Sequence, residues 1–328
     1  MVQEKIKALR SLCALWLLPV IVFVACVLSN TSAFAQTTHL LVITGVPGDE
    51  EHAKQFAKWA DAFVDAAKKK DAVADGNITV LADRAATKEG VEKAFADLSA
   101  RVRPSDAVVV LLIGHGSFNG TQAAFNLPGP DLTAQDWAKL LGKLPSLRVA
   151  FVNTSSASGA FLPTVAAPGR VVITATKTGG ERNETVFPEY FVAAFADPSA
   201  DRDRNGHVSL AEAFEYAKAK VVQAFQQKGL LLTEHATLDD SGEGQLAAQM
   251  YLGIGRADAV LTADTNDPAV KKLVDEKDAI DQQIAGLKLR KNGMPAAQYD
   301  EQMERLLTEL ALKTKAIRDL QAKKEKRD

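Results

Sequence analysis

The amino-acid sequence predicts an α/β fold, in which helices cover both faces of a mostly parallel sheet. From His39 onward, short β-branched runs alternate with amphipathic helical segments, an alternation typical of parallel sheets. Within segment 50–70, Phe56, Trp59 and Phe63 recur at spacings of three and four residues, so that face of the helix packs on the sheet. The hydrophobic share of 47% is ordinary for a globular protein, and 328 residues suffice for one large domain plus an appendage.

The alternation assigns five strands and four helices to this domain. The expected strands are residues 40–44, 78–82, 107–113, 148–152 and 170–174. The expected helices are residues 50–70, 88–101, 134–144 and 187–196. Sites in open α/β sheets collect in the loops beyond the carboxyl ends of the strands, so we expect the functional residues there.

Residues 1–35 have the pattern of a secretory signal peptide. Three basic residues precede an uncharged apolar run over 12–28, and Ala33-Phe34-Ala35 provides a cleavage site before Gln36. The pattern predicts export to the periplasm or the medium, with no stable membrane span after cleavage. An uncleaved N-terminal anchor is the alternative, because a run of about 17 apolar residues approaches the length that spans a bilayer.

Removal of the leader changes the charge and the thiol content. It takes away three basic residues and one acidic residue, so the formal charge moves from −2 to −4. No basic field that would bind nucleic acid remains. Both cysteines, Cys13 and Cys26, lie in the leader, so the mature chain is expected to have no disulfide and no cysteine nucleophile.

A histidine and a cluster of hydroxyls follow two consecutive predicted strands. Strand 107–113 runs into Gly114-His115-Gly116, and strand 148–152 opens into the serine-rich turn 153–159, which contains Ser156. If the two strands are neighbours, the imidazole and the hydroxyls lie side by side, and imidazole is the usual proton acceptor near neutral pH. The alternative is a structural histidine beside turn hydroxyls that bond to nearby backbone.

The order and strand context of these two motifs resemble the caspase and legumain clan of peptidases. In that clan one strand ends with His-Gly and the next with Cys-x-Ser-Gly, and here Ser156-Ala157-Ser158-Gly159 stands in the second position. The resemblance covers roughly residues 39–228 and implies a caspase-like fold. It also maps the clan's nucleophilic cysteine onto Ser156, so the chain looks like a bacterial-type exported homologue without the catalytic thiol.

The replacement of sulfur by oxygen leaves two functions open. A serine hydroxyl needs a hydrogen-bonded base and usually a third group that orients the base, and the sequence offers no obvious acidic partner for His115. The first reading is a silent peptidase homologue, a pseudoenzyme whose cleft holds a peptide or protein partner. The second is a hydrolase, with Ser156 as nucleophile, His115 as general base and the Gly116 amide in an oxyanion hole.

The loop after the last predicted strand resembles the loop that shapes the specificity pocket in legumain-like peptidases. Thr176 and Glu181 are the candidate substrate-binding residues, and Glu181 with Glu184 could bind a basic group. The alternative is that Glu181, Asn183 and Glu184 cap the following helix, where negative charge is favourable.

Residues 201–212 match the EF-hand calcium loop at each diagnostic position. The expected ligands are side-chain oxygens, with position 7 contributing its backbone carbonyl: Asp201, Asp203, Asn205, His207, Ser209 and Glu212. Predicted helices flank the loop, so we expect a structural Ca2+ ion. The alternative is a degenerate loop tied by its own hydrogen bonds, in which Arg202 and Arg204 lower the calcium affinity.

The C-terminal part differs in kind from the sheet domain. An acidic connector, 229–267, contains His235 and several aspartates, whose spacing matches no common metal template. Residues 268–328 carry two stretches of apolar residues at heptad spacing around a break at 292–295, which predicts an antiparallel helical hairpin or short coiled coil. The hairpin is expected to brace the main domain, to self-associate or to bind a partner helix.

Overall fold

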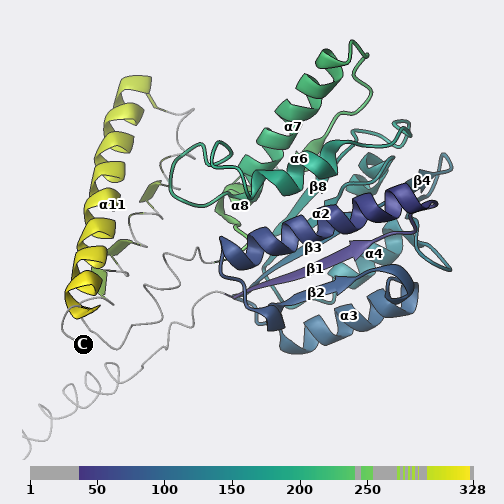
Figure 1. Ribbon diagram of the computed structural model, residues 1–328, viewed down its shortest axis with the longest axis horizontal. Helices are drawn as coiled ribbons and strands as arrows, with labels where there is room; N and C mark the ends of the chain where they lie inside the picture. Colours follow the sequence, from purple (N-terminus) through teal and green to yellow (C-terminus); the bar gives the residue numbers. More distant parts are fainter. Residues whose placement is uncertain are drawn as a thin grey trace, which may run out of the picture. The chain divides into compact units, whose positions relative to one another are not determined.

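The computed structural model describes residues 37–240, 245–253, 272–273, 276–277, 280, 283–284, 287 and 294–325 (Figure 1). The predicted leader, residues 1–35, and residues 254–267 of the predicted connector lie outside the described residues. In the described part of the chain, no helix is both long enough and apolar enough to cross a membrane.

A six-stranded sheet forms the centre of the domain (Figure 1). Its parallel strands are β1 (Thr38–Thr44), β2 (Ile78–Leu81), β3 (Ala107–Ile113), β7 (Arg148–Asn153) and β8 (Arg170–Thr174). The spatial order is β2-β1-β3-β7-β8-β9, and β9 (Thr237–Asp239) pairs antiparallel with β8. The predicted α/β class and its five strands are confirmed. The sixth strand, β9, was not predicted because three residues are too few for an alternating pattern to be recognised.

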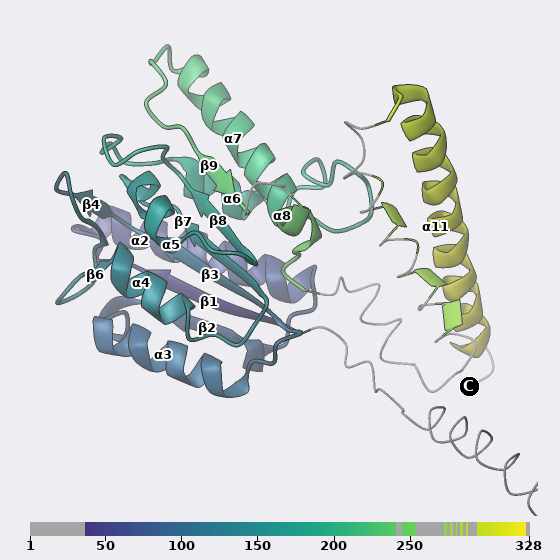
Figure 2. The ribbon, with the colours of Figure 1, turned by 180° about the vertical axis from the view of Figure 1, so that it is seen from behind.

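Helices cover both faces of this sheet (Figure 2). On one face lie α2 (Glu50–Lys69), α6 (Phe187–Ala194) and α7 (Leu210–Gln227). The other face carries α3 (Lys88–Arg101), α4 (Ala134–Leu141) and α5 (Leu162–Val165). Successive side chains of a strand point to opposite faces, so Leu40 and Val42 pack under α2 while Leu41 and Ile43 pack under α3 and α4.

The helix ends follow from local capping. The Asp49 carboxylate accepts the amide of His52 at 2.9 Å and starts α2. Thr133 and Asp136 form a capping box at the start of α4. The helix ends three residues before the predicted limit, where the amides of Lys143 and Leu144 turn back to the carbonyls of Leu140 and Leu141. Helix α6 ends at Ala194, two residues earlier than predicted, because the amide of Ala196 turns back to the Ala193 carbonyl.

A small antiparallel sheet extends from the carboxyl end of β3. It consists of β4 (Gly116–Phe118), β5 (Ala123–Phe125) and β6 (Leu132–Thr133). The amide of Asn126 donates to the His115 carbonyl at 3.0 Å. The backbone on both sides of His115 is therefore held by regular strand pairing.

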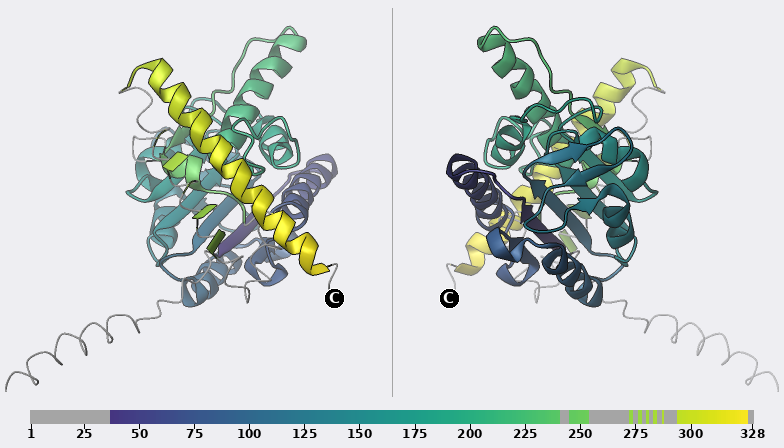
Figure 3. Two further views of the ribbon diagram at one scale, coloured as in Figure 1. Left: turned by 90° about the vertical axis from the view of Figure 1, so that its left-hand side faces the viewer. Right: turned by 90° about the vertical axis from the view of Figure 1, so that its right-hand side faces the viewer.

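The C-terminal helix α11 (Ala296–Glu325) is long and continuous (Figure 3). Described residues of the preceding segment pack against it: Ile280, Ile284 and Leu287 form one apolar cluster with Leu306. Farther along, Leu273 packs near Ile317 and Leu320, and Glu276 forms an ion pair with Lys313. The contacts run in opposite order along the two segments.

Candidate functional site

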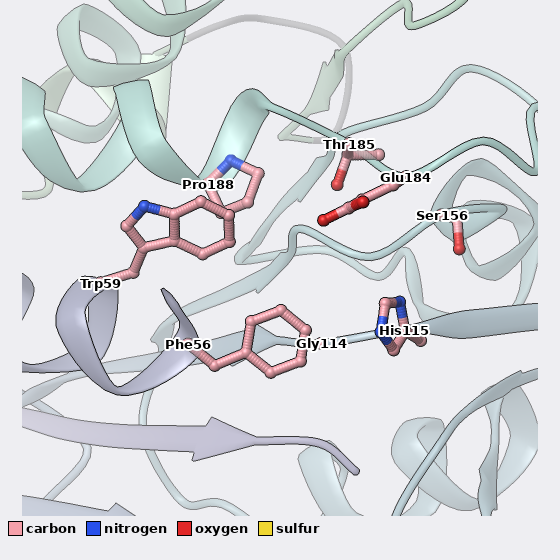
Figure 4. A pocket seen from close by; sticks show the side chains of 8 residues that line it. All are labelled: Phe56, Trp59, Gly114, His115, Ser156, Glu184, Thr185 and Pro188. Atoms are coloured by element: carbon pink, nitrogen blue, oxygen red, sulfur yellow. The ribbon is translucent and has the colours of Figure 1, made fainter. Parts of the chain in front are cut away.

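His115 and Ser156 follow neighbouring strands of the sheet. Strands β3 and β7 pair in parallel with Leu112 opposite Asn153, so each candidate residue lies three positions beyond this matched pair. The prediction that the two strands are neighbours is confirmed, and both residues line one pocket (Figure 4).

The Ser156 hydroxyl is bonded to backbone of the histidine turn. Its Oγ lies 3.0 Å from the Gly116 carbonyl, to which it donates, and the Gly116 amide lies 3.4 Å from the same Oγ. The neighbouring Ser155 is fully buried and donates to the Asn153 side chain at 2.7 Å. Both serines therefore have local partners, which is the arrangement expected of turn hydroxyls.

The His115 ring is oriented by a backbone carbonyl. Its Nε2 lies 3.1 Å from the carbonyl oxygen of Pro47. Because a carbonyl oxygen only accepts, Nε2 carries the proton of the neutral ring and Nδ1 keeps the lone pair. Within the described part of the chain, no hydrogen bond joins His115 to Ser156 and no carboxylate bonds to the His115 ring.

The turn that carries Ser156 is strained and tightly packed. Ala157 has φ of 54°, a left-handed conformation that an alanine rarely adopts. Its amide donates to the Glu181 carbonyl at 2.8 Å. A Cβ atom at Gly116 would lie 2.4 Å from the Ser156 carbonyl oxygen and 2.5 Å from the Ser155 hydroxyl. The histidine turn and the serine turn are therefore in direct backbone contact.

The two candidate substrate-binding residues do not line the pocket. Thr176 is buried, and its hydroxyl accepts the Gly159 amide at 2.9 Å and contacts the Ser158 hydroxyl at 3.2 Å. The Glu181 carboxylate accepts the His235 amide at 3.0 Å. Thr176 thus supports the serine turn, while Glu181 is directed toward segment 233–235.

Residues 233–235, which we call the strap, hold the loop that precedes α6. The strap makes hydrogen bonds to Glu181, Asn183, Val186 and Phe187. The Glu234 carboxylate accepts the amides of Val186 and Phe187 at 2.9 Å each and so caps α6. Burial raises the pKa of Glu234 to about 7, although both amide hydrogen bonds oppose the rise.

The pocket joins this loop to α2 and to the two strand ends. Its lining residues are Phe56, Trp59, Gly114, His115, Ser156, Glu184, Thr185 and Pro188. Figure 4 shows the Glu184 carboxylate directed into the pocket, with Trp59 and Phe56 on one side and His115 and Ser156 on the other. The cavity volume is about 10 Å³, which is at the lower limit for a single water molecule.

A second histidine, His52, was missed by the sequence analysis and contacts two residues of this pocket, Glu184 and His115. His52 Nδ1 is 2.7 Å from Asp49 Oδ2, and His52 Nε2 is 3.1 Å from Glu184 Oε1. The ring centroids of His52 and His115 are 5.1 Å apart. Hydrogen bonds to Asp49 and then to Glu184 raise the pKa of His52. The available signal was its place in the first turn of a helix, where a cation is unfavourable without carboxylate partners.

The acidic side chains of the predicted calcium loop converge. Carboxylate oxygens of Asp201, Asp203 and Glu212 all lie within 4.8 Å of one another. Gly206, with φ of 93°, makes the tight turn that the sixth position of an EF-hand requires. An all-oxygen donor set of this kind suits Ca²⁺, so the described residues fit the ion.

The same loop also satisfies many of its own polar groups. Asp201 accepts the Gly206 amide at 2.9 Å, and Asn205 accepts the His207 amide at 2.8 Å. Ser209 donates to Glu212 at 2.8 Å, in the capping box that starts α7. The His207 Nδ1 atom lies 3.9 Å from Asp71 Oδ1.

The His235 region contains no comparable group. The His235 ring lies 3.1 Å from Glu181, and Asp240 accepts the Ala247 amide at 3.1 Å. Within the described ranges, the only cluster of three potential metal-binding side chains is that of the 201–212 loop. Residues 241–244 of this region lie outside the description.

Comparison with known proteins gives distant structural similarity. No protein-family model matches the chain, and no curated protein does. A structural-genomics protein of Geobacter sulfurreducens aligns at 13% identity and a TM-score of 0.45, over 65% of this chain and 97% of that one. The caspase drICE aligns at 10% identity and a TM-score of 0.39, over 64% of this chain and 90% of its own.

Proposed function

We propose that the chain is a caspase/legumain-like peptidase homologue that binds a peptide in the cleft at His115 and Ser156 without cutting it. The observation that carries the proposal is the separate engagement of the two residues. The Ser156 hydroxyl donates to the Gly116 carbonyl, and the His115 Nε2 donates to the Pro47 carbonyl. A serine without a hydrogen-bonded base is a poor nucleophile, so the cleft is suited to binding rather than to cleavage.

The caspase-like part of the proposal rests on topology and on motif placement. The His-Gly and Ser-x-Ser-Gly motifs follow adjacent parallel strands, β3 and β7, at the edge where sites of open α/β sheets collect. An extended peptide could lie across this edge, beside the pocket that Glu184 lines.

An active serine hydrolase is the second candidate, and three observations favour it. Ala157 is strained beside the nucleophile, Nδ1 of His115 holds a lone pair, and no described residue accepts a hydrogen bond from the Ser156 amide. In this mechanism Ser156 Oγ attacks the peptide carbonyl after rotating from Gly116, His115 takes its proton, and the Gly116 and Ser156 amides stabilise the oxyanion.

A serine-directed phosphonate probe separates the two candidates. We expect the full chain to retain peptides from a library and to show no labelling of Ser156, with or without calcium. Labelling that disappears in Ser156→Ala and in His115→Ala, but persists in Ser117→Ala, would establish the hydrolase instead. Ser117 is a matched control because it is an exposed serine one residue beyond Gly116.

We further propose that the loop 201–212 binds a structural calcium ion through Asp201, Asp203, Asn205, the His207 carbonyl, Ser209 and Glu212. The convergence of three carboxylates supports this assignment, because the ion would neutralise their mutual repulsion. When bound, calcium would link the segment after α6 to the first turn of α7, where Glu212 lies.

The remaining elements of the proposal are export and a C-terminal hairpin. Residues 1–35 would direct export, on the pattern of their sequence alone. The opposite order of contacts between segment 273–287 and α11 supports an antiparallel hairpin or short coiled coil. This hairpin would offer a surface for self-association or for a partner chain.

A further inference from the structure

The pocket beside His115 combines one carboxylate with aromatic walls. The Glu184 carboxylate points into it, while Phe56 and Trp59 form the opposite wall from α2 (Figure 4). Both aromatic side chains are at least 95% buried, so their positions are fixed by packing. Carboxylates form strong charge-assisted hydrogen bonds with cations, and aromatic faces attract cations through the ring quadrupole. The chemistry of the lining therefore favours a positively charged group.

A histidine of the chain itself already contacts the carboxylate of this pocket. Both nitrogens of His52 face carboxylates, Nδ1 toward Asp49 at 2.7 Å and Nε2 toward Glu184 at 3.1 Å. An ionised carboxylate only accepts, so both nitrogens donate, and only the protonated imidazole can do that. The ring also contacts Phe56 and His115, with centroid distances of 6.0 Å and 5.1 Å.

We propose that the pocket binds a guanidinium or ammonium group of a peptide ligand, and that the His52 imidazolium is a built-in competitor for Glu184. The inference rests on the proposed peptide-binding cleft and adds the class of side chain that the cleft selects. The cavity of about 10 Å³ is too small for such a group. The ligand's cation would therefore replace the His52 ring at the Glu184 carboxylate, which lies 3.1 Å from Nε2.

The contacts of His52 are of a kind that a ligand can displace. The side chains of His52, Asp49 and Glu184 are 23%, 57% and 51% exposed. Water screens ion pairs at this level of exposure, and they contribute little stability. A ligand cation that reaches between Glu184 and the aromatic wall is more fully desolvated, so its ion pair is stronger.

Competition by His52 makes the binding of cations depend on pH. Three titratable side chains face the His52 ring: Asp49, Glu184 and His115. The two carboxylates raise the pKa of His52 above 6.5, so the imidazolium persists at pH 6 and is lost as the pH rises through the raised value. Cationic ligands should therefore bind more tightly at pH 8.5 than at pH 6.

The test compares N-acetyl-arginine amide with its neutral citrulline counterpart, using calorimetric titration of the full chain. We expect the arginine compound to bind at least tenfold more tightly than the citrulline compound. Glu184→Gln should abolish this preference, whereas Glu189→Gln should retain it. Glu189 is a matched control because it is an exposed carboxylate on α6 outside the pocket lining.

His52→Gln tests the competitor directly. We expect it to tighten arginine binding severalfold at pH 6 and to change it little at pH 8.5. Equal affinities of wild type and His52→Gln at pH 6, with melting curves that show both to be folded, would overturn the role of His52. A third probe, butylguanidinium, tests whether the cation must belong to a peptide. If it binds as tightly as the arginine amide, the proposal of a peptide ligand is wrong and the pocket binds small free cations.

The outcomes separate this inference from the proposed function. If peptides bind but arginine and citrulline bind equally, the selection of cations is wrong and the peptide cleft stands. If neither compound nor any library peptide binds to the folded chain, both proposals fall.

Discussion

Replacing Glu234 by glutamine should remove a pH-dependent loss of stability. The side chain is 4% exposed and caps α6 by accepting the amides of Val186 and Phe187. Its pKa rises on folding from 4.5 to about 7, chiefly because burial disfavours the charged form. Between these values the folded protein holds a proton that the unfolded chain has released, so the stability of the folded state falls as the pH rises.

The size of this effect follows from the two pKa values. With 4.5 in the unfolded chain and about 7 in the folded protein, linkage gives a loss of about 2.5 kcal/mol between pH 5 and pH 8. Glutamine does not titrate, so it removes the pH dependence. It has one acceptor oxygen, so it keeps one of the two amide hydrogen bonds, and that loss is the same at every pH. Glu234→Gln should therefore gain about 2.5 kcal/mol on wild type across this range.

Urea unfolding followed by circular dichroism at pH 5, 6, 7 and 8 measures the difference. Other groups titrate over the same range, so the informative quantity is the gap between the variant and wild type at each pH. Glu189→Gln, at an exposed position on α6, controls for the loss of one negative charge. Parallel stability curves for wild type and Glu234→Gln would refute the reasoning, because they would mean that the buried carboxyl titrates alike in both states.

Three further predictions concern other parts of the fold. Adding calcium should raise the melting temperature of wild type and leave that of Glu212→Gln unchanged; an equal rise in both would exclude the 201–212 loop as the site. Gly159→Ala should destabilise the domain by about 1–3 kcal/mol in urea, because its Cβ would lie 2.3 Å from the Lys177 backbone, whereas Gly76→Ala has open space and should be nearly neutral. Asp106→Asn should lower the free energy of unfolding by about 2 kcal/mol at pH 7. Burial raises the pKa of Asp106, but hydrogen bonds led by those from Arg103 bring it down to about 2. The stability that the ionised carboxylate contributes is therefore lost as the pH falls from 3.8 toward 2. An unchanged acid limb in the Asp106→Asn unfolding profile would contradict this.

The sequence was sufficient for the sheet and for the meeting of His115 with Ser156. Five apolar runs alternate with helical patterns, and consecutive strands of such folds are usually neighbours, so the two strand ends could be matched without coordinates. The sequence left two roles open for the Ser156 hydroxyl, a nucleophile or a turn hydroxyl bonded to backbone. Its hydrogen bond to the Gly116 carbonyl depends on the side-chain rotamer, which no sequence pattern predicts.

Residues whose roles depend on distant partners could not be predicted. The position of His52 depends on its contact with Glu184, a residue distant from it in the sequence. Glu234 lies in a polar stretch whose composition predicts an exposed loop. It is buried nevertheless, because its carboxylate accepts two backbone amides at the start of α6. Glu181 and Glu184 are three residues apart and chemically identical, yet Glu181 bonds to the strap and Glu184 lines the pocket.

The contact between the histidine turn and the serine turn limits what position 116 can carry. Gly116 meets the Ser156 carbonyl and the Ser155 side chain so closely that no side chain fits between the turns. The separation of the two turns is thus fixed by close packing at Gly116. If the proposed cleft binds a peptide, a substitution at position 156 can change the chemistry of the cleft while the glycine keeps its two turns together.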